Sequence, residues 1–221
     1  MKATSIRIAA VTIGAAPRPD LTDQLRRAMP RADVVEIGAL DDLPPDIAPP
    51  DPGADGYPLR TKGPGGRPIL ADEAWLAPRV QAAVGRGEAD GVDLTILLCA
   101  GGFATVTSLG PLIRPFEATV DRLRTLGAHR LGVVVPIPGQ VLPSRAKWLA
   151  AGFNVEVLAG SPAEVGQFLD STPLPDAIVL DYVGHGPAEV LAAAEATARA
   201  RVPVIDLLVV AIEAAVATMA T

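Results

Sequence analysis

The sequence predicts an α/β protein made of two similar halves, each a mostly parallel sheet with helices on both faces. Apolar runs alternate with helix-patterned segments along the whole chain, which is typical of strands joined by right-handed crossovers. The run at residues 94–98 is apolar on both faces, as in a buried parallel strand. A second run, at 177–181, also ends in a glycine-containing loop. We expect one half at 1–115 and another at 116–202, and residues 203–221 can pack back on the first half.

The first half begins with a strand at 6–13 and a loop that leads to a helix, for which Asp20 is the expected cap. Residues 43–68 are rich in Pro and Gly and are expected to be irregular, because these residues block regular structure. Residues 57–62, inside this segment, are expected to pair as a hairpin with residues 68–70, which begin at its end. The remaining predicted elements are a strand at 34–37, a helix at 72–87 and a strand at 94–98.

The second half repeats the alternation of strands and helices. Ser161 and Glu164 have the spacing of a capping box, in which each side chain satisfies a free backbone N–H at a helix start. The predicted strands lie at 131–135, 155–158, 177–181 and 202–205. The predicted helices lie at 116–126, 144–151, from 161 onward, at 187–201 and from about 206 through 215.

Composition favours a protein whose partner is a small molecule. The 221 residues are 49% hydrophobic, which is ample for a core. A net charge of −6 without a basic cluster argues against binding to nucleic acid. The single cysteine cannot form an internal disulfide, and the two histidines lack metal-ligand spacing, so we expect no metal site. The first apolar run is too short to span a membrane and resembles no export signal, so we expect a cytoplasmic protein with no membrane partner. Alanine-rich helices are compatible with a homo-oligomer.

Cys99 is the candidate reactive residue. It follows the strand at 94–98, and ligands of parallel sheets bind outside the carboxyl ends of the strands. A thiol acts as base or nucleophile only as thiolate, so its ordinary pKa near 8.5 would have to be lowered. The backbone N–H groups of Gly101, Gly102 and Phe103 are candidate donors to a carboxylate or enolate. The alternatives are an inert buried thiol and a loop that only turns the chain.

With these residues in view, the chain resembles the AroM-like family, a branch of the aspartate/glutamate racemase superfamily. The matching segments, in order, are Thr12-Ile13-Gly14 with Pro17-Arg18, Leu97 to Phe103, Gly132 to Pro136 with Gln140 and Lys147-Trp148, and Leu180 to Gly184. The resemblance implies flavodoxin-like halves with the active site between them. It also implies two cysteines that exchange protons with the α-carbon of a carboxylate, without a cofactor. Cys99 matches the first cysteine, and Tyr182 stands at the second.

Tyr182 is therefore the candidate acid. A phenol with a pKa near 10 donates a proton readily but is a poor base at neutral pH, so a thiol/phenol pair suits one-sided chemistry better than racemisation. The alternative is an aromatic ring that packs over the ligand. His185 is a candidate for tuning the phenol, with a surface loop histidine as the alternative.

Further substrate-binding candidates come from the same matching segments. Arg18 could clamp a carboxylate through its forked donors, and Gln140 could hydrogen-bond the substrate. The alternative for both is a solvated loop side chain. The remaining candidates are Thr12, Gly14 and Gly184.

Together these residues favour a cofactor-independent racemase or isomerase that acts on a small carboxylate or related carbonyl compound through Cys99. The superfamily also contains maleate isomerases, hydantoin racemases and arylmalonate decarboxylases, so a single-thiol decarboxylase or lyase is a second hypothesis. A third is a carboxylate-binding or regulatory protein without catalysis, which the tyrosine in place of the second cysteine favours.

Overall fold

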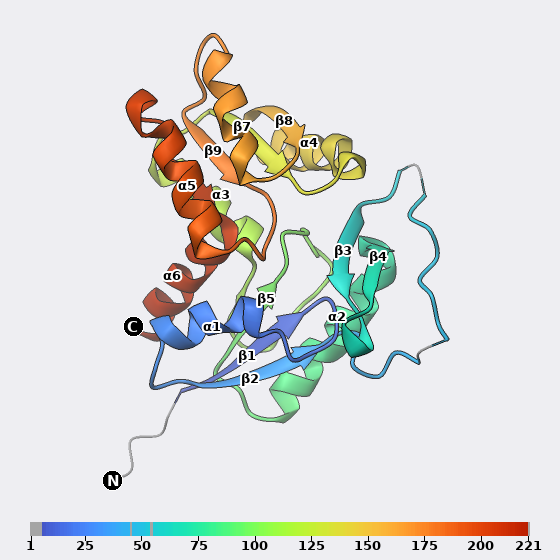
Figure 1. The fold of residues 1–221 in the computed structure, drawn as a ribbon. Helices are drawn as coiled ribbons and strands as arrows, with labels where there is room; N and C mark the ends of the chain where they lie inside the picture. Colours follow the sequence, from blue (N-terminus) through green and yellow to red (C-terminus); the bar gives the residue numbers. More distant parts are fainter. Residues whose placement is uncertain (1–5, 45, 54, 221) are drawn as a thin grey trace. The chain divides into compact units, whose positions relative to one another are not determined.

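The computed structural model describes residues 6–44, 46–53 and 55–220, so Pro45 and Ala54 of the predicted irregular segment lie outside it. The chain divides into two units (Figure 1). The first comprises the chain up to Pro115 together with the segment from Ala211 onward, and the second comprises Phe116–Val210.

The first unit is built on a parallel sheet in the order β2-β1-β5-β6. β1 and β5 are its central strands, and Val11 of β1 is in register with Leu97 of β5. Every residue of β5 is buried, as expected for an apolar run covered on both faces. β6 is a two-residue strand that sequence periodicity did not reveal. The bounds are β1 (Arg7–Thr12), β2 (Asp33–Gly38), β5 (Leu94–Leu98) and β6 (Leu112–Ile113).

Two helices and a hairpin complete the description of this unit up to Pro115. The hairpin is antiparallel, with Leu59 opposite Ala71, as the sequence predicted. The predicted cap of the first helix was wrong: α1 begins at Pro19 after Arg18, and no side chain caps it. Asp72 does cap α2, accepting a hydrogen bond from the Ala74 N–H at 2.7 Å. The bounds are α1 (Pro19–Ala28), β3 (Pro58–Lys62), the 3₁₀ turn η1 (Pro64–Gly66), β4 (Pro68–Asp72) and α2 (Glu73–Ala89).

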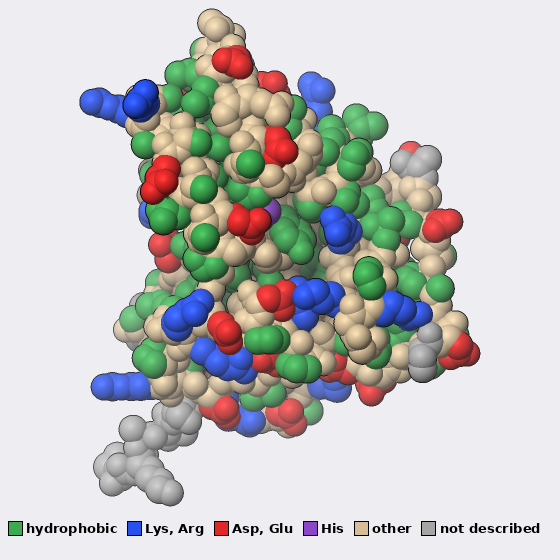
Figure 2. Space-filling view, in the orientation of Figure 1, with side chains coloured by type: hydrophobic (Ala, Val, Ile, Leu, Met, Phe, Trp, Pro, Cys, Tyr) green, Lys and Arg blue, Asp and Glu red, His purple; other side chains and the backbone are tan. Residues whose placement is uncertain are grey.

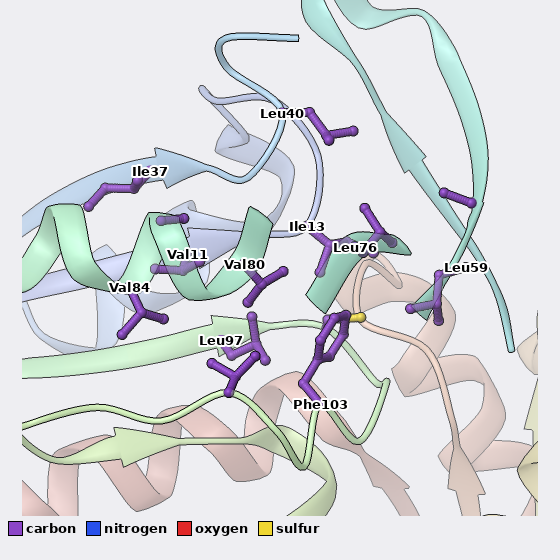
Figure 3. Close-up of a cluster of buried hydrophobic side chains, with 14 of the residues drawn as sticks. Val11, Ile13, Ile37, Leu40, Leu59, Leu76, Val80, Val84, Leu97 and Phe103 are labelled. Carbon is purple, nitrogen blue, oxygen red and sulfur yellow. The ribbon is translucent and has the colours of Figure 1, made fainter. Parts of the chain in front are cut away.

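The core of the first unit lies where β1, β5, α2 and the hairpin meet (Figure 3). Leu76 and Val80 of α2 pack with Val11 and Leu97, because they recur at the helical spacing of four residues. Cys99 and Phe103 belong to the same buried cluster. The start of the loop after β5 is therefore packed into the core of its unit.

The second unit has a parallel sheet in the order β10-β9-β7-β8. Its first strand is central and its second lies at an edge, as in the first unit. Two details differ from the sequence prediction. Helix α4 starts at Val141, earlier than predicted, and the capping box at Ser161 begins a 3₁₀ helix. From Pro115 onward the bounds are α3 (Pro115–Thr125), β7 (Arg130–Val135), η2 (Pro138–Gln140), α4 (Val141–Ala150), β8 (Asn154–Ala159), η3 (Pro162–Asp170), β9 (Ala177–Leu180), α5 (Pro187–Thr197), η4 (Ala198–Ala200), β10 (Val204–Asp206) and α6 (Leu207–Met219). The residues of α6 from Ala211 onward belong to the first unit.

The predicted α/β fold with mostly parallel sheets and similar halves is confirmed, since both sheets share one strand order. Among the described residues, no helix combines the length and the apolar character that crossing a membrane requires. On the face in Figure 2, Lys and Arg side chains are interspersed with Asp and Glu, and neither sign forms a continuous patch there.

Candidate functional site

Cys99 lies directly beyond the carboxyl end of β5, with 4% of its surface exposed. Its N–H donates to the Leu97 carbonyl at 3.0 Å, which turns the chain out of the strand. The Gly101 N–H then donates to the Cys99 Sγ at 3.3 Å. A donor aimed at sulfur stabilises the thiolate more than the thiol, because the charged acceptor makes the stronger hydrogen bond. The loop thus gives the thiol one feature that a reactive cysteine needs.

The next two N–H groups are engaged by the protein itself. Gly102 N and Phe103 N donate to the two carboxylate oxygens of Glu73, each at 3.0 Å. Phe103 has a φ of +43°, in the left-handed region that bulky residues rarely adopt. Consecutive N–H groups around such a residue form an anion-binding nest. The donors expected to bind a substrate carboxylate therefore form a nest here, and Glu73 fills it.

The Phe103 side chain does not line an open site. Phe103 is 1% exposed, and its ring belongs to the core cluster (Figure 3). Gly101 is equally confined, since a Cβ there would lie 2.7 Å from Glu73 Oε2 and 2.7 Å from the Phe103 ring. Glycine at 101 is required by this close approach.

Thr12 is the last residue of β1 and Gly14 lies in the loop that follows, at the same carboxyl edge of the sheet as Cys99. The Gly14 N–H donates to Thr12 Oγ1 at 3.3 Å, and Thr12 is 2% exposed. A Cβ on Gly14 would lie 2.3 Å from the Lys62 carbonyl oxygen, so the hairpin packs directly on this glycine. Both residues shape the loop, and their N–H and hydroxyl groups are hydrogen-bonded to each other.

Arg18 is buried and paired within its own loop, so the alternative of a solvated side chain is wrong. Its Nε and Nη2 donate to the two carboxylate oxygens of Asp20 at 2.9 and 2.8 Å, and the residue is 7% exposed. The hydrogen bond from Arg18 lowers the pKa of Asp20, and the charge of Lys62 adds to the effect. The guanidinium that was expected to bind a substrate carboxylate therefore binds the carboxylate of Asp20, two residues away in the chain.

Glu36 holds the backbone of this loop. Its carboxylate accepts from Arg18 N at 2.5 Å and from Thr22 Oγ1 at 2.9 Å, and it pairs with Arg26 at 2.8 Å. Burial raises the pKa of Glu36, but these hydrogen bonds outweigh burial, so the pKa is lowered overall. Glu36 is thus a charged anchor of the first loop, and sequence analysis missed it.

In the second unit, Asp181 begins the corresponding loop and accepts hydrogen bonds from three side chains. It follows β9, is 1% exposed, and accepts from Ser144 Oγ at 2.6 Å, Lys147 Nζ at 2.8 Å and Trp148 Nε1 at 2.9 Å. The Lys147 ammonium also lies 4.7 Å from the centre of the Phe116 ring. Asp181 therefore fastens α4 to the end of β9, immediately before Tyr182.

Tyr182, Gly184 and His185 form one cluster. The Tyr182 and His185 rings meet edge to face with centres 5.1 Å apart. A Cβ on Gly184, whose φ is +134°, would lie 3.0 Å from the Tyr182 ring. His185 is 8% exposed, so the alternative of a surface histidine is wrong. Burial lowers the pKa of His185, partly offset by the charge of Glu189. The predicted neighbours of the phenol do lie beside it.

Gln140 sits at the amino end of α4, after β7, and is 4% exposed. It belongs to the same unit as Tyr182 and Asp181. Its amide is buried, so the alternative of a solvated side chain is wrong for this residue.

Asp206 is a further residue that sequence analysis missed. It ends β10 and is 5% exposed. Its Oδ1 accepts from Val209 N at 2.9 Å, and its Oδ2 is buried with no hydrogen-bond partner within the described part of the chain. Burial raises the pKa of Asp206 to about 6. The predicted strand stopped at Ile205, and an acidic residue directly before an apolar helix was the available signal.

The architecture is that of a two-unit α/β protein in which Cys99 follows β5 and Tyr182 lies in the loop after β9. The chain belongs to the AroM protein family, which matches residues 8–216. No curated protein matches the chain.

Three similar solved structures share this fold at low sequence identity. A glycine-to-cysteine, cysteine-to-serine variant of arylmalonate decarboxylase in its liganded form has a TM-score of 0.67 and 17% identity, covering 96% of this chain and 91% of that one. Allantoin racemase from Klebsiella pneumoniae has a TM-score of 0.65 and 21% identity, covering 98% and 88%. A cysteine-to-serine variant of Nocardia farcinica maleate cis-trans isomerase, with a covalently bound succinylcysteine intermediate, has a TM-score of 0.58 and 17% identity, covering 97% and 92%.

Proposed function

We propose that the protein is a cofactor-independent enzyme of racemase or isomerase type that acts on a small carboxylate or a related carbonyl compound. The observation that carries the proposal is the Gly101 N–H aimed at the Cys99 Sγ beyond the carboxyl end of β5. This is the sheet edge where α/β proteins bind ligands, and the hydrogen bond favours the thiolate. The succinylcysteine of the similar maleate isomerase supports a cysteine that attacks carbon.

In the proposed mechanism the Cys99 thiolate either removes a proton from the α-carbon or adds to an unsaturated carbon of the substrate. Negative charge then develops on the substrate carboxylate or carbonyl oxygen, which requires donors placed in advance. Tyr182 is the proposed proton donor, since a phenol is the better acid than base at neutral pH. His185, with its pKa lowered by burial, is the proposed neutral hydrogen-bonding neighbour of that phenol.

Mass-resolved deuterium exchange in heavy water tests the proposal. Small amino acids, hydroxy acids and dicarboxylates are incubated with the protein, and exchange at the α-carbon is followed. Cys99→Ser is expected to abolish exchange, and Tyr182→Phe is expected to slow it by about 10²-fold or more, the size of a lost general acid. Tyr57→Phe, which changes the other tyrosine of the chain, is expected to leave the rate unchanged.

Two other functions are favoured by specific observations. The tyrosine that stands in place of a second cysteine, Tyr182, supports a carboxylate-binding protein without catalysis. In that case no compound exchanges, yet some raise the melting temperature. The similarity to arylmalonate decarboxylase and the single thiol support a decarboxylase. Release of carbon dioxide from substituted malonates, lost in Cys99→Ser, would select this activity.

A further inference from the structure

Glu73 is the first residue of α2, and it reaches across to the loop that follows Cys99. Its two carboxylate oxygens accept from two consecutive backbone N–H groups, those of Gly102 and Phe103, at 3.0 Å each. One carboxylate on two adjacent donors is bidentate, and charge-assisted bonds of this kind are the strong ones. The contact fixes the loop at the point where the chain leaves the core.

The loop needs such a contact. Phe103 holds a φ of +43°, which is strained for a bulky residue and persists only where its surroundings enforce it. Two contacts enforce it here: the ring is buried in the core cluster, and the N–H is held by Glu73. Gly101, whose N–H donates to the Cys99 Sγ, is also packed against Glu73 Oε2. The position of the thiol's donor therefore depends on the Glu73 carboxylate.

We infer that Glu73 is the positioning residue of Cys99: its carboxylate fills the nest of the Gly102 and Phe103 N–H groups and thereby keeps the Gly101 N–H directed at the sulfur. Glu73 acts through the loop and not on a substrate. The nest takes a carboxylate, so a small free carboxylate is the chemical equivalent of the missing group when Glu73 is shortened.

A cavity lies beside Glu73. Glu73 lines a cavity of about 680 Å³ in the first unit, together with Gln81 of α2 and with Ala104 and Thr105, which directly follow the nest. Formate is far smaller than this volume. In a Glu73→Ala variant, formate is expected to reach the nest from the cavity and take the place of the lost carboxylate.

The chain offers a matched control on the same helix. Glu88 of α2 also accepts from a loop of the first unit, from Ser108 Oγ at 2.8 Å and Leu109 N at 2.5 Å. Glu88→Ala thus removes a similar helix-to-loop contact several residues away from the nest. Comparing the two variants therefore distinguishes a general loss of stability from a specific release of the loop that follows Cys99.

The experiment measures the rate of alkylation of Cys99 by iodoacetamide from pH 6 to pH 10, which is unambiguous because the chain has one cysteine. Glu73→Ala is expected to raise the plateau rate at high pH at least tenfold, since the buried sulfur becomes accessible. Formate is expected to return the rate of Glu73→Ala toward the wild-type value saturably, and sodium chloride at the same ionic strength is not. Glu88→Ala is expected to keep the wild-type profile and to ignore formate.

Equal acceleration in Glu73→Ala and Glu88→Ala, or equal effects of formate and chloride, would overturn the inference. If Glu73→Ala does not fold, Glu73→Gln decides: one acceptor remains, so an intermediate plateau is expected, and a wild-type profile contradicts the positioning role. The inference concerns the thiol of the proposed function but does not depend on it. Alkylation reports on the loop even if no substrate exchanges, so the two proposals can fail separately.

Discussion

The two units share one strand order, yet the loop after the third strand in the chain order of each sheet, β5 or β9, is held differently. The loop donates hydrogen bonds in the first unit and accepts them in the second. In the first unit, the loop after β5 donates its N–H groups to a carboxylate on helix α2. In the second unit, the loop after β9 supplies the carboxylate, and helix α4 supplies the donors through Ser144, Lys147 and Trp148. The same topology therefore fixes its loop either by backbone donors or by a buried charge.

The comparison extends to the other charged groups at these edges. In the first unit, the Arg18 guanidinium donates to Asp20, and the Arg18 backbone N–H donates to Glu36. In the second, Asp181 is saturated with donors, whereas Asp206 has one buried oxygen without a partner within the described residues. A saturated buried charge stabilises its loop, and a half-satisfied one costs free energy.

The largest effect is expected from breaking the anchor of the second unit. Asp181→Ala leaves the Lys147 ammonium, whose side chain is only 10% exposed, without its carboxylate. Removing one partner of a buried pair should lower the free energy of unfolding by about 4 kcal/mol, measured by urea denaturation. The double variant Asp181→Leu, Lys147→Met should recover only part of the loss, because an apolar pair replaces the charges while Ser144 and Trp148 still lose their acceptor. A loss below about 1 kcal/mol in the single variant would contradict this anchor.

A somewhat smaller effect, of opposite sign, is expected at Asp206. With its pKa raised to about 6, the folded protein keeps a proton that the unfolded chain releases near pH 4. Wild-type stability should therefore fall as the pH rises from about 4 to about 6, by roughly 3 kcal/mol at 1.36 kcal/mol per pKa unit, and stay reduced above that window. Asp206→Asn keeps the cap to Val209 and should remove this loss. Unfolding measured at pH 4 and pH 8 checks it, and a variant with the wild-type pH dependence would refute it.

The smallest effect is expected where the first unit exposes its ion pair. The Asp20 side chain is 41% exposed, so solvent screens its pair with Arg18. Asp20→Asn should destabilise the protein by no more than about 1 kcal/mol at neutral pH, and less in 0.5 M salt. The pKa of Asp20 is lowered in the folded state, so this contribution is present above its unfolded pKa and disappears as the pH falls through the folded value. An unchanged difference at high salt would indicate packing rather than charge.

The fold was predictable from sequence because its signals are local. The buried run at 94–98, the hairpin at 58–72 and the capping box at Ser161 each depend on neighbouring residues. Errors came where the signals were weak, as for the short strand β6 and the cap assigned to Asp20. In the candidate site, the cluster of Tyr182, Gly184 and His185 could be predicted because these residues are close together in the sequence. Their catalytic and binding roles remain proposals.

By itself, the sequence determined the alternation of strands and helices, the two similar sheets, the family, and the placement of Cys99 after a buried strand. The tertiary structure alone decided which charged group holds which loop. Glu73 meets Gly102 across 29 residues of chain, and Lys147 meets Asp181 across 34. Periodicity reports on the face that a residue occupies, but the partner of a buried charge is set by which distant element packs there, since burial requires that each charge be paired.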